Sequence, residues 1–170
     1  MRQTLRNSKL WTLGVLLALL MPPVCHTQTL TIALSASAVN FSLVRASATN
    51  LGNISINVTS SWVIGGQHRN MTVYCYFANA NAALTDGAGD NIPSSAFSIS
   101  TNGTAFRPLI ISEVFGGANA GRRVIADIPI TGTGHRTDNV VFNIDLSTGT
   151  LPNLPPGTYT GTLTVRAQAV

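Results

Sequence analysis

Lysine is absent from this sequence after Lys9, and cysteine occurs only at Cys25 and Cys75. Without lysine, the chain beyond Lys9 cannot perform Schiff-base chemistry, supply the lysine of a phosphate-binding loop or form a lysine–asparagine crosslink. The sequence also lacks a Gly-x-Ser-x-Gly elbow and any His-x-x-x-His or Cys-x-x-Cys spacing. These absences remove the usual sequence signatures of hydrolases, metal sites and redox sites.

Two histidines lie beyond the N-terminal segment, His68 and His135, and each precedes an arginine in a glycine-flanked stretch typical of a solvated turn. A spatial triad of His135, Asp138 and a serine stays open, because triads are defined by geometry and not by order in the chain. We nevertheless predict a non-enzymatic protein without a cofactor.

The first residues have the three parts of an export signal. Arg2, Arg6 and Lys9 precede an apolar run of about twelve residues, too short for the roughly twenty that span a bilayer. Pro22 and Pro23 end that run, and the residues after them favour cleavage after Thr27.

We therefore predict a signal peptide over residues 1–27 and one domain over 28–170, with no membrane span after cleavage. Lipidation of Cys25 is the alternative, but Val24 stands where lipoproteins have a small residue. The expected location is secreted, periplasmic or at the cell surface.

Charge beyond the signal is nearly balanced. Ten basic residues, less the three of the signal, leave seven against six acidic ones, so the net charge of the predicted mature chain is about +1. Arg122 and Arg123 form the only adjacent basic pair in that part. Because nucleic-acid binding needs a basic patch, we predict no nucleic-acid partner.

Cys75 would be the only thiol of the mature chain, which excludes an intramolecular disulfide. Met71, Val73, Cys75 and Phe77 alternate with polar or aromatic residues. This period of two predicts that Cys75 is a buried, small hydrophobic residue on the inner face of a strand.

Short segments of alternating polarity, separated by Gly, Asn, Pro and Ser clusters, continue along the chain. The expected strands are 30–34, 39–44, 54–64, 71–77, 97–101, 104–109, 109–115, 124–130, 140–146 and 158–170. Turns are expected at Gly65-Gly66, at Asn102-Gly103 and over 131–138, and a short helical turn is possible within 78–95. This pattern predicts an all-β fold, an antiparallel two-sheet immunoglobulin-like sandwich, with a jelly roll as the alternative.

The closing segment, Leu154 to Val165, reads Leu-Pro-Pro-Gly-Thr-Tyr-Thr-Gly-Thr-Leu-Thr-Val. It resembles the turn and last strand of secreted bacterial domains related to spore coat protein U and chaperone-usher pilins. The resemblance implies an exported surface-structural or adhesive, fimbrial-like subunit that joins other copies of itself, or similar subunits, by strand addition. Two features depart from pilins, the missing disulfide and Ala169 at the penultimate position, where pilins tend to have an aromatic residue.

Three groups of residues are candidate sites. Leu30, Ile32 and Leu34 alternate within residues 28–36, which could serve as a strand donated to a neighbouring sheet or as the first strand of the chain's own sandwich. Trp62, Tyr74 and Tyr76 would support the alternative function, a carbohydrate- or ligand-binding module, if they share one exposed patch. Asp86, Asp90 and Asn91 are weak calcium candidates, set against an ordinary Asp-Gly turn.

Five asparagines stand in Asn-x-Ser or Asn-x-Thr triplets: Asn40, Asn53, Asn57, Asn70 and Asn102. Such triplets accept glycans in a eukaryotic secretory pathway. In so polar a β composition several arise by chance, and we interpret the source as bacterial.

Overall fold

The computed structural model describes residues 28–110 and 120–170. The predicted signal peptide, and most of the strand expected over 109–115, lie outside this part. The strands are β1 (Thr29–Leu34), β2 (Asn50–Leu51), β3 (Ile56–Phe77), β4 (Leu84–Thr85), β5 (Asn91–Ile92), β6 (Phe97–Thr101), β7 (Arg107–Pro108), β8 (Gly121–Ile144) and β9 (Leu163–Ala169). Two short 3-10 helices, η2 (Ser94–Ala96) and η3 (Leu151–Asn153), complete the described elements.

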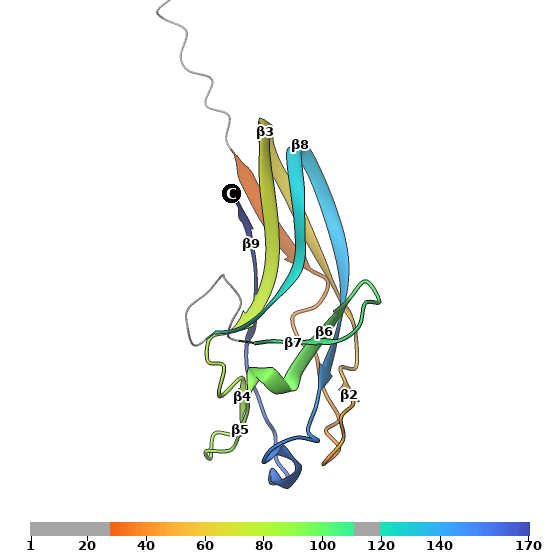
Figure 1. The fold of residues 1–170 in the computed structure, drawn as a ribbon, viewed down its shortest axis with the longest axis vertical. Coiled ribbons are helices and arrows are strands. Elements are labelled where there is room, and N and C mark those ends of the chain that lie inside the picture. The colour runs from red at the N-terminus through yellow and green to blue at the C-terminus, as the bar shows by residue number, and fades with distance from the viewer. Residues whose placement is uncertain (1–27, 111–119) are drawn as a thin grey trace, which may run out of the picture.

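Two long antiparallel strands, β3 and β8, form the centre of the molecule. Both fold over at the upper end in Figure 1, near Gly65 and Gly132, which have φ angles of +64° and +60°. A shift in the pairing register between Val63 and His68 marks the same place. Because glycine adopts positive φ without steric cost, these residues allow a strand to pass from one layer to the other.

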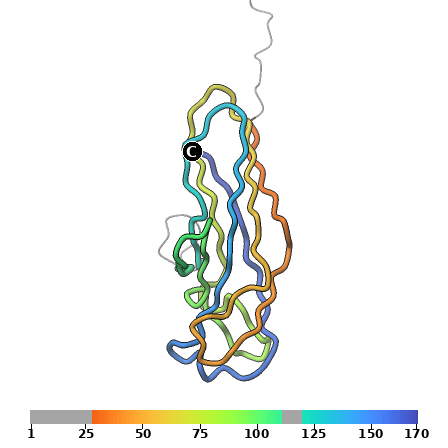
Figure 2. Tube along the Cα trace, turned by 90° about the vertical axis from the view of Figure 1, so that its right-hand side faces the viewer, coloured from red at the N-terminus to blue at the C-terminus, as the bar shows by residue number. Residues whose placement is uncertain are grey.

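The two halves of β3 and β8 therefore lie in opposite layers, which Figure 2 shows from the side. One layer has the order β1, first half of β3, second half of β8, β6, with β2 also paired to the end of β8. The other layer consists of β9, the second half of β3 and the first half of β8. The predicted all-β antiparallel sandwich is confirmed.

A single apolar core lies between the layers. Val58 and Val140 come from one layer, Met71 and Val73 from the other, and all four side chains are at most 1% exposed. Burying a side chain of this size contributes about 1.5–3 kcal/mol to folding, an upper estimate for each. The predicted inner face of 71–77 is confirmed, since Cys75 and Phe77 are buried in the same cluster.

Two expectations about the strands are wrong. The strand expected over 39–44 is absent, and a single bridge from Phe41 to Gly52 stands in its place. At Gly65-Gly66 the chain does change direction as expected, although the segments on either side both remain paired to β8. The turn expected over 131–138 lies within β8 for the same reason, since a continuous partner strand keeps its hydrogen-bond ladder intact.

The turn at Asn102-Gly103 is confirmed. Both residues have positive φ, +51° and +78°, and the Thr104 amide donates to the Thr101 carbonyl at 3.1 Å. This geometry agrees with a type I′ turn, for which Asn-Gly is the preferred pair. The strand expected after the turn, over 104–109, is reduced to β7.

Within the described residues, no helix is long and apolar enough to cross a membrane.

Candidate functional site

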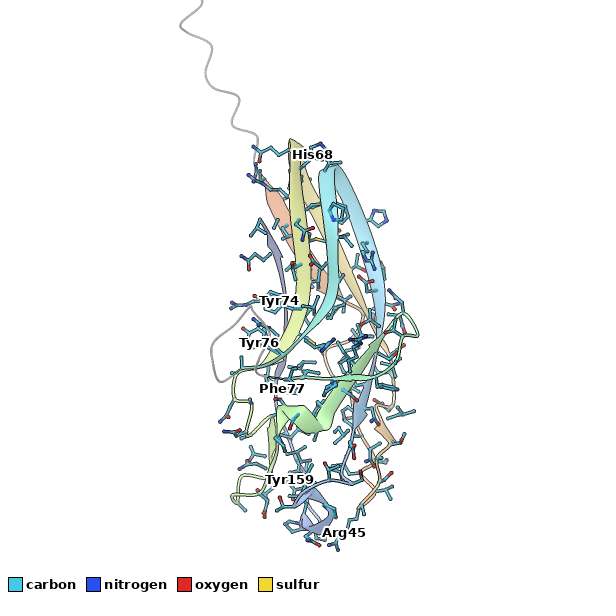
Figure 3. All side chains as sticks on the ribbon, in the orientation of Figure 1. Arg45, His68, Tyr74, Tyr76, Phe77 and Tyr159 are labelled. Carbon is cyan, nitrogen blue, oxygen red and sulfur yellow. The ribbon has the colours of Figure 1, made fainter. Side chains whose placement is uncertain are left out.

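The three candidate aromatic residues lie in different layers. Tyr74 and Tyr76, labelled in Figure 3, stack with ring centroids 6.0 Å apart, and the Arg166 guanidinium lies 5.8 Å from the Tyr76 centroid. Trp62 belongs to the first half of β3, packs on Gly134 and donates its indole N–H to the Thr131 carbonyl at 3.3 Å. Trp62 therefore does not extend the tyrosine pair into one ligand-binding patch.

In the acidic turn at residues 86–91, the Asp86 carboxylate accepts hydrogen bonds from the backbone of the same turn. One oxygen of Asp86, Oδ1, accepts the backbone N–H groups of Ala88, Gly89 and Asp90 at 2.8–3.1 Å. The Asn91 amide donates to the Gly89 carbonyl at 3.1 Å. Across residues 28–110 and 120–170, no group of three or more His, Cys, Asp or Glu side chains is placed to hold a metal ion.

His135 and Asp138 point to opposite faces of β8, because they are three residues apart on a strand. His135 is exposed and faces outward beside Ser61, whereas the Asp138 carboxylate is 1% exposed. Asp138 accepts hydrogen bonds from Arg136, as close as 2.6 Å, and from the Asn102 amide at 2.7 Å. The structure thus does not bring His135 and Asp138 together.

Residues 28–36 pair within the chain. Strand β1 runs antiparallel to β3, from Thr29 opposite Val63 to Leu34 opposite Val58. Leu30 and Ile32 are half-buried against the core, and Leu34 is 43% exposed. The candidate donor residues thus form the first strand of the chain's own sandwich, and they lie at its edge.

A groove of about 810 Å³ separates this edge from the opposite one. Its walls are the segment from Leu34 to Leu43 on one side and the segment from Leu154 to Val165 on the other. In Figure 1, β1 begins and β9 ends near the upper end, and the two strands diverge toward the lower end. The floor of the groove is core: Ile56, Val58, Cys75, Phe77, Phe142 and Ile144.

Both edge strands have backbone hydrogen-bonding groups that are directed away from β3. The Ser35 amide donates to Asn57, and Asn70 and Val170 exchange both backbone hydrogen bonds. Because antiparallel ladders alternate, the N–H and C=O groups directed away from β3 belong to Leu30, Ile32 and Leu34 in β1, and to the inner-face residues of β9. Those residues of β9 are Leu163, Val165, Ala167 and Ala169. No ladder among the described residues pairs with either outer edge.

The inner face of β9 is incompletely covered as a result. The side chains of Tyr159, Leu163, Val165, Ala167 and Ala169 pack against the core. None of them is fully buried, however, whereas Val73 on the paired strand is 0% exposed. The core face of β9 is therefore less completely covered than that of the neighbouring second half of β3.

The outer edge of β8 differs in residue content from the edges formed by β1 and β9. It pairs with β6 only over Val140 to Ile144, and the stretch before that contains Pro129 and the Arg136–Asp138 ion pair. Arg136 and Asp138 lie opposite Ser60 and Val58, so both are on the inner face of the sheet. Proline and inward-pointing charges are the devices by which proteins prevent strand addition. Neither device occurs in β1, and β9 has one charged residue, the outward-facing Arg166.

Cys75 is the one ionisable side chain on the groove floor. It is 1% exposed, and burial raises the pKa of its thiol from 9.0 to about 12. Since the thiolate is the reactive form, a shift of three units lowers the thiolate fraction at neutral pH roughly a thousandfold.

We expect native protein to react with iodoacetamide at pH 8 roughly a thousandfold more slowly at Cys75 than urea-unfolded protein does. Peptide mass spectrometry at timed intervals measures both rates on the same residue. Equal rates in the two states would show that Cys75 is not buried as described.

The sequence matches no known protein-family model and no curated protein. What the geometry defines is a class: an antiparallel β-sandwich with one open, apolar side between its first and last strands. Sequence reasoning missed the groove, because no residue pattern marks the empty space between two segments 120 residues apart.

Proposed function

We propose that this chain is an exported, non-enzymatic, surface-structural subunit that associates with other copies of itself, or with similar subunits, by β-strand addition at the groove between β1 and β9. The observation that carries the proposal is the contrast between its two open edges. The β8 edge contains proline and an inward ion pair, whereas strands β1 and β9 have neither and flank the groove.

An incoming strand of alternating polarity could make two kinds of contact in the groove. Its backbone would pair with the outward groups of β1 or β9, and its apolar side chains would pack against the apolar lining of the groove. Within the predicted mature chain, Thr29–Leu34 has the pattern of such a strand, with Leu30, Ile32 and Leu34 on one face. In the structure this segment is the chain's own β1, so it forms the edge to which a strand of another subunit would add.

Two sequence observations agree with the proposal. The N-terminal segment has the features of an export signal, and residues 154–165 resemble the last strand of secreted surface domains. The alternative, a carbohydrate-binding module, is supported less well, since Trp62 does not lie with the tyrosine pair.

Leu34→Lys tests the proposal. Leu34 is 43% exposed and lines the groove, so a lysine there keeps its charge in water in the monomer but would be buried by an added strand. We expect wild-type protein starting at Gln28 to form concentration-dependent oligomers, and Leu34→Lys to weaken association at least about a hundredfold. Size-exclusion chromatography with light scattering over a wide concentration range measures this.

Leu51→Lys is the matched control. Leu51 is 50% exposed, lies in β2 and does not line the groove, so the same change should leave association unaltered. A wild-type protein that stays monomeric at all concentrations, or a Leu34→Lys variant that associates as Leu51→Lys does, would refute the proposal.

A further inference from the structure

The same groove has a second property, which concerns the subunit before any strand enters it. Its floor consists of buried core residues from both layers, and partly buried apolar side chains such as Val39, Leu43 and Leu163 line its walls. A cavity of about 810 Å³ with apolar walls lies within the size range of small-molecule sites. A single-chain hydrophobic ligand therefore has room in the groove.

The charge of the groove is confined to one place. Arg45 is the only charged residue among the described residues that line it. Figure 3 shows Arg45 at the lower end of the molecule, below Tyr159. The groove thus combines a long apolar surface with a single cation at one end.

Arg45 is positioned to bind an anion. Its side chain is exposed, and its Nε donates to the Pro152 carbonyl at 3.2 Å, which anchors the guanidinium beside η3. Among the described residues, no carboxylate lies within ion-pair distance of Arg45. On the other wall, Asp86 and Asp90 act electrostatically on Tyr159, so a negative headgroup is favoured on the Arg45 side.

We propose that the unassembled subunit binds a long-chain fatty acid in the groove, with the carboxylate on Arg45 and the hydrocarbon chain against the apolar side chains of the walls. A carboxylate matches the guanidinium, because two parallel N–H donors can meet its two oxygens. The chain replaces water at the partly exposed apolar side chains of the walls, among them Leu34, which is 43% exposed. The proposal goes beyond strand addition and does not require it, although both occupants would use the same groove.

Fluorescence titration with cis-parinaric acid, which emits when its chain enters an apolar site, tests the proposal. We expect saturable binding to wild-type protein at one site per chain, with displacement by palmitate and by its neutral analogue, palmityl alcohol. Arg45→Gln should weaken palmitate about fivefold, the effect of a strong exposed ion pair, and leave palmityl alcohol unchanged.

Arg107→Gln is the control, because Arg107 is also exposed but does not line the groove. Absence of saturable binding, or equal palmitate affinities of the Arg45→Gln and Arg107→Gln variants, would overturn the proposal. Light scattering on the lipid-free samples reports association separately. Failure of fatty-acid binding is therefore distinguishable from failure of strand addition.

Discussion

Gly161→Ala is expected to lower the free energy of unfolding by about 3 kcal/mol, through a clash of backbone with a new side chain. A Cβ at this position would overlap the Ala83 carbonyl oxygen and lie 2.8 Å from a methyl carbon of Leu84. A backbone oxygen cannot rotate away as a flexible side chain can. The β4–β5 hairpin would have to move away from the segment that leads into β9.

That movement would break two backbone hydrogen bonds. Thr85 and Thr160 exchange N–H to C=O bonds of 2.9 Å, and they join the hairpin to the groove wall. Equilibrium urea unfolding followed by circular dichroism measures the difference in stability.

Gly157→Ala is the matched control in the same segment. Its Cβ would meet a ring carbon of Tyr159 at 3.8 Å, an ordinary contact, and Gly157 does not have a positive φ. We expect its stability to equal or slightly exceed that of the wild type, because alanine restricts the unfolded chain. If both variants unfolded at the same urea concentration, the close approach at Gly161 would not exist in solution.

Deletion of residues 28–36 is expected to abolish the native fold. The deletion removes β1, exposes the ladder of β3 from Val58 to Val63 and uncovers the core that Leu30 and Ile32 pack against. An unpaired edge over an open core has the properties of an aggregation site. Circular dichroism and light scattering should show lost cooperative unfolding and large aggregates.

A synthetic peptide of residues 28–36 should restore the fold when it is added to the deleted chain during refolding. The same peptide with Leu30→Asp and Ile32→Asp should not, because two carboxylates would face the core. A deleted chain that stays monomeric and unfolds cooperatively without peptide would contradict the assignment of β1 as part of this sandwich.

The sequence by itself determined the local features of the protein. Alternation around Cys75 placed Met71, Val73 and Phe77 on the inner face, and Asn102-Gly103 specified its turn. These predictions succeeded because side-chain alternation and positive φ angles are properties of a few neighbouring residues. The all-β class follows from the same local patterns repeated along the chain.

Tertiary structure decided which strands are neighbours. Gly65-Gly66 indicated a turn between 54–64 and 71–77, but only the fold shows that each of these segments pairs with β8 and that the glycines let the strand cross between layers. Residues 39–44 have the pattern of a strand, yet they line the groove with a single bridge, because no strand lies alongside to complete a ladder.

The position of the candidate site also depends on the tertiary structure. Leu30, Ile32 and Leu34 could be recognised as a strand, but their alternation is the same whether the partner strand belongs to this chain or to another. Only the fold places them in the edge strand β1, with Leu34 lining the groove and Arg45 at the lower end of the molecule. A groove is defined by segments far apart in sequence and by the space between them, and neither leaves a trace in local residue patterns.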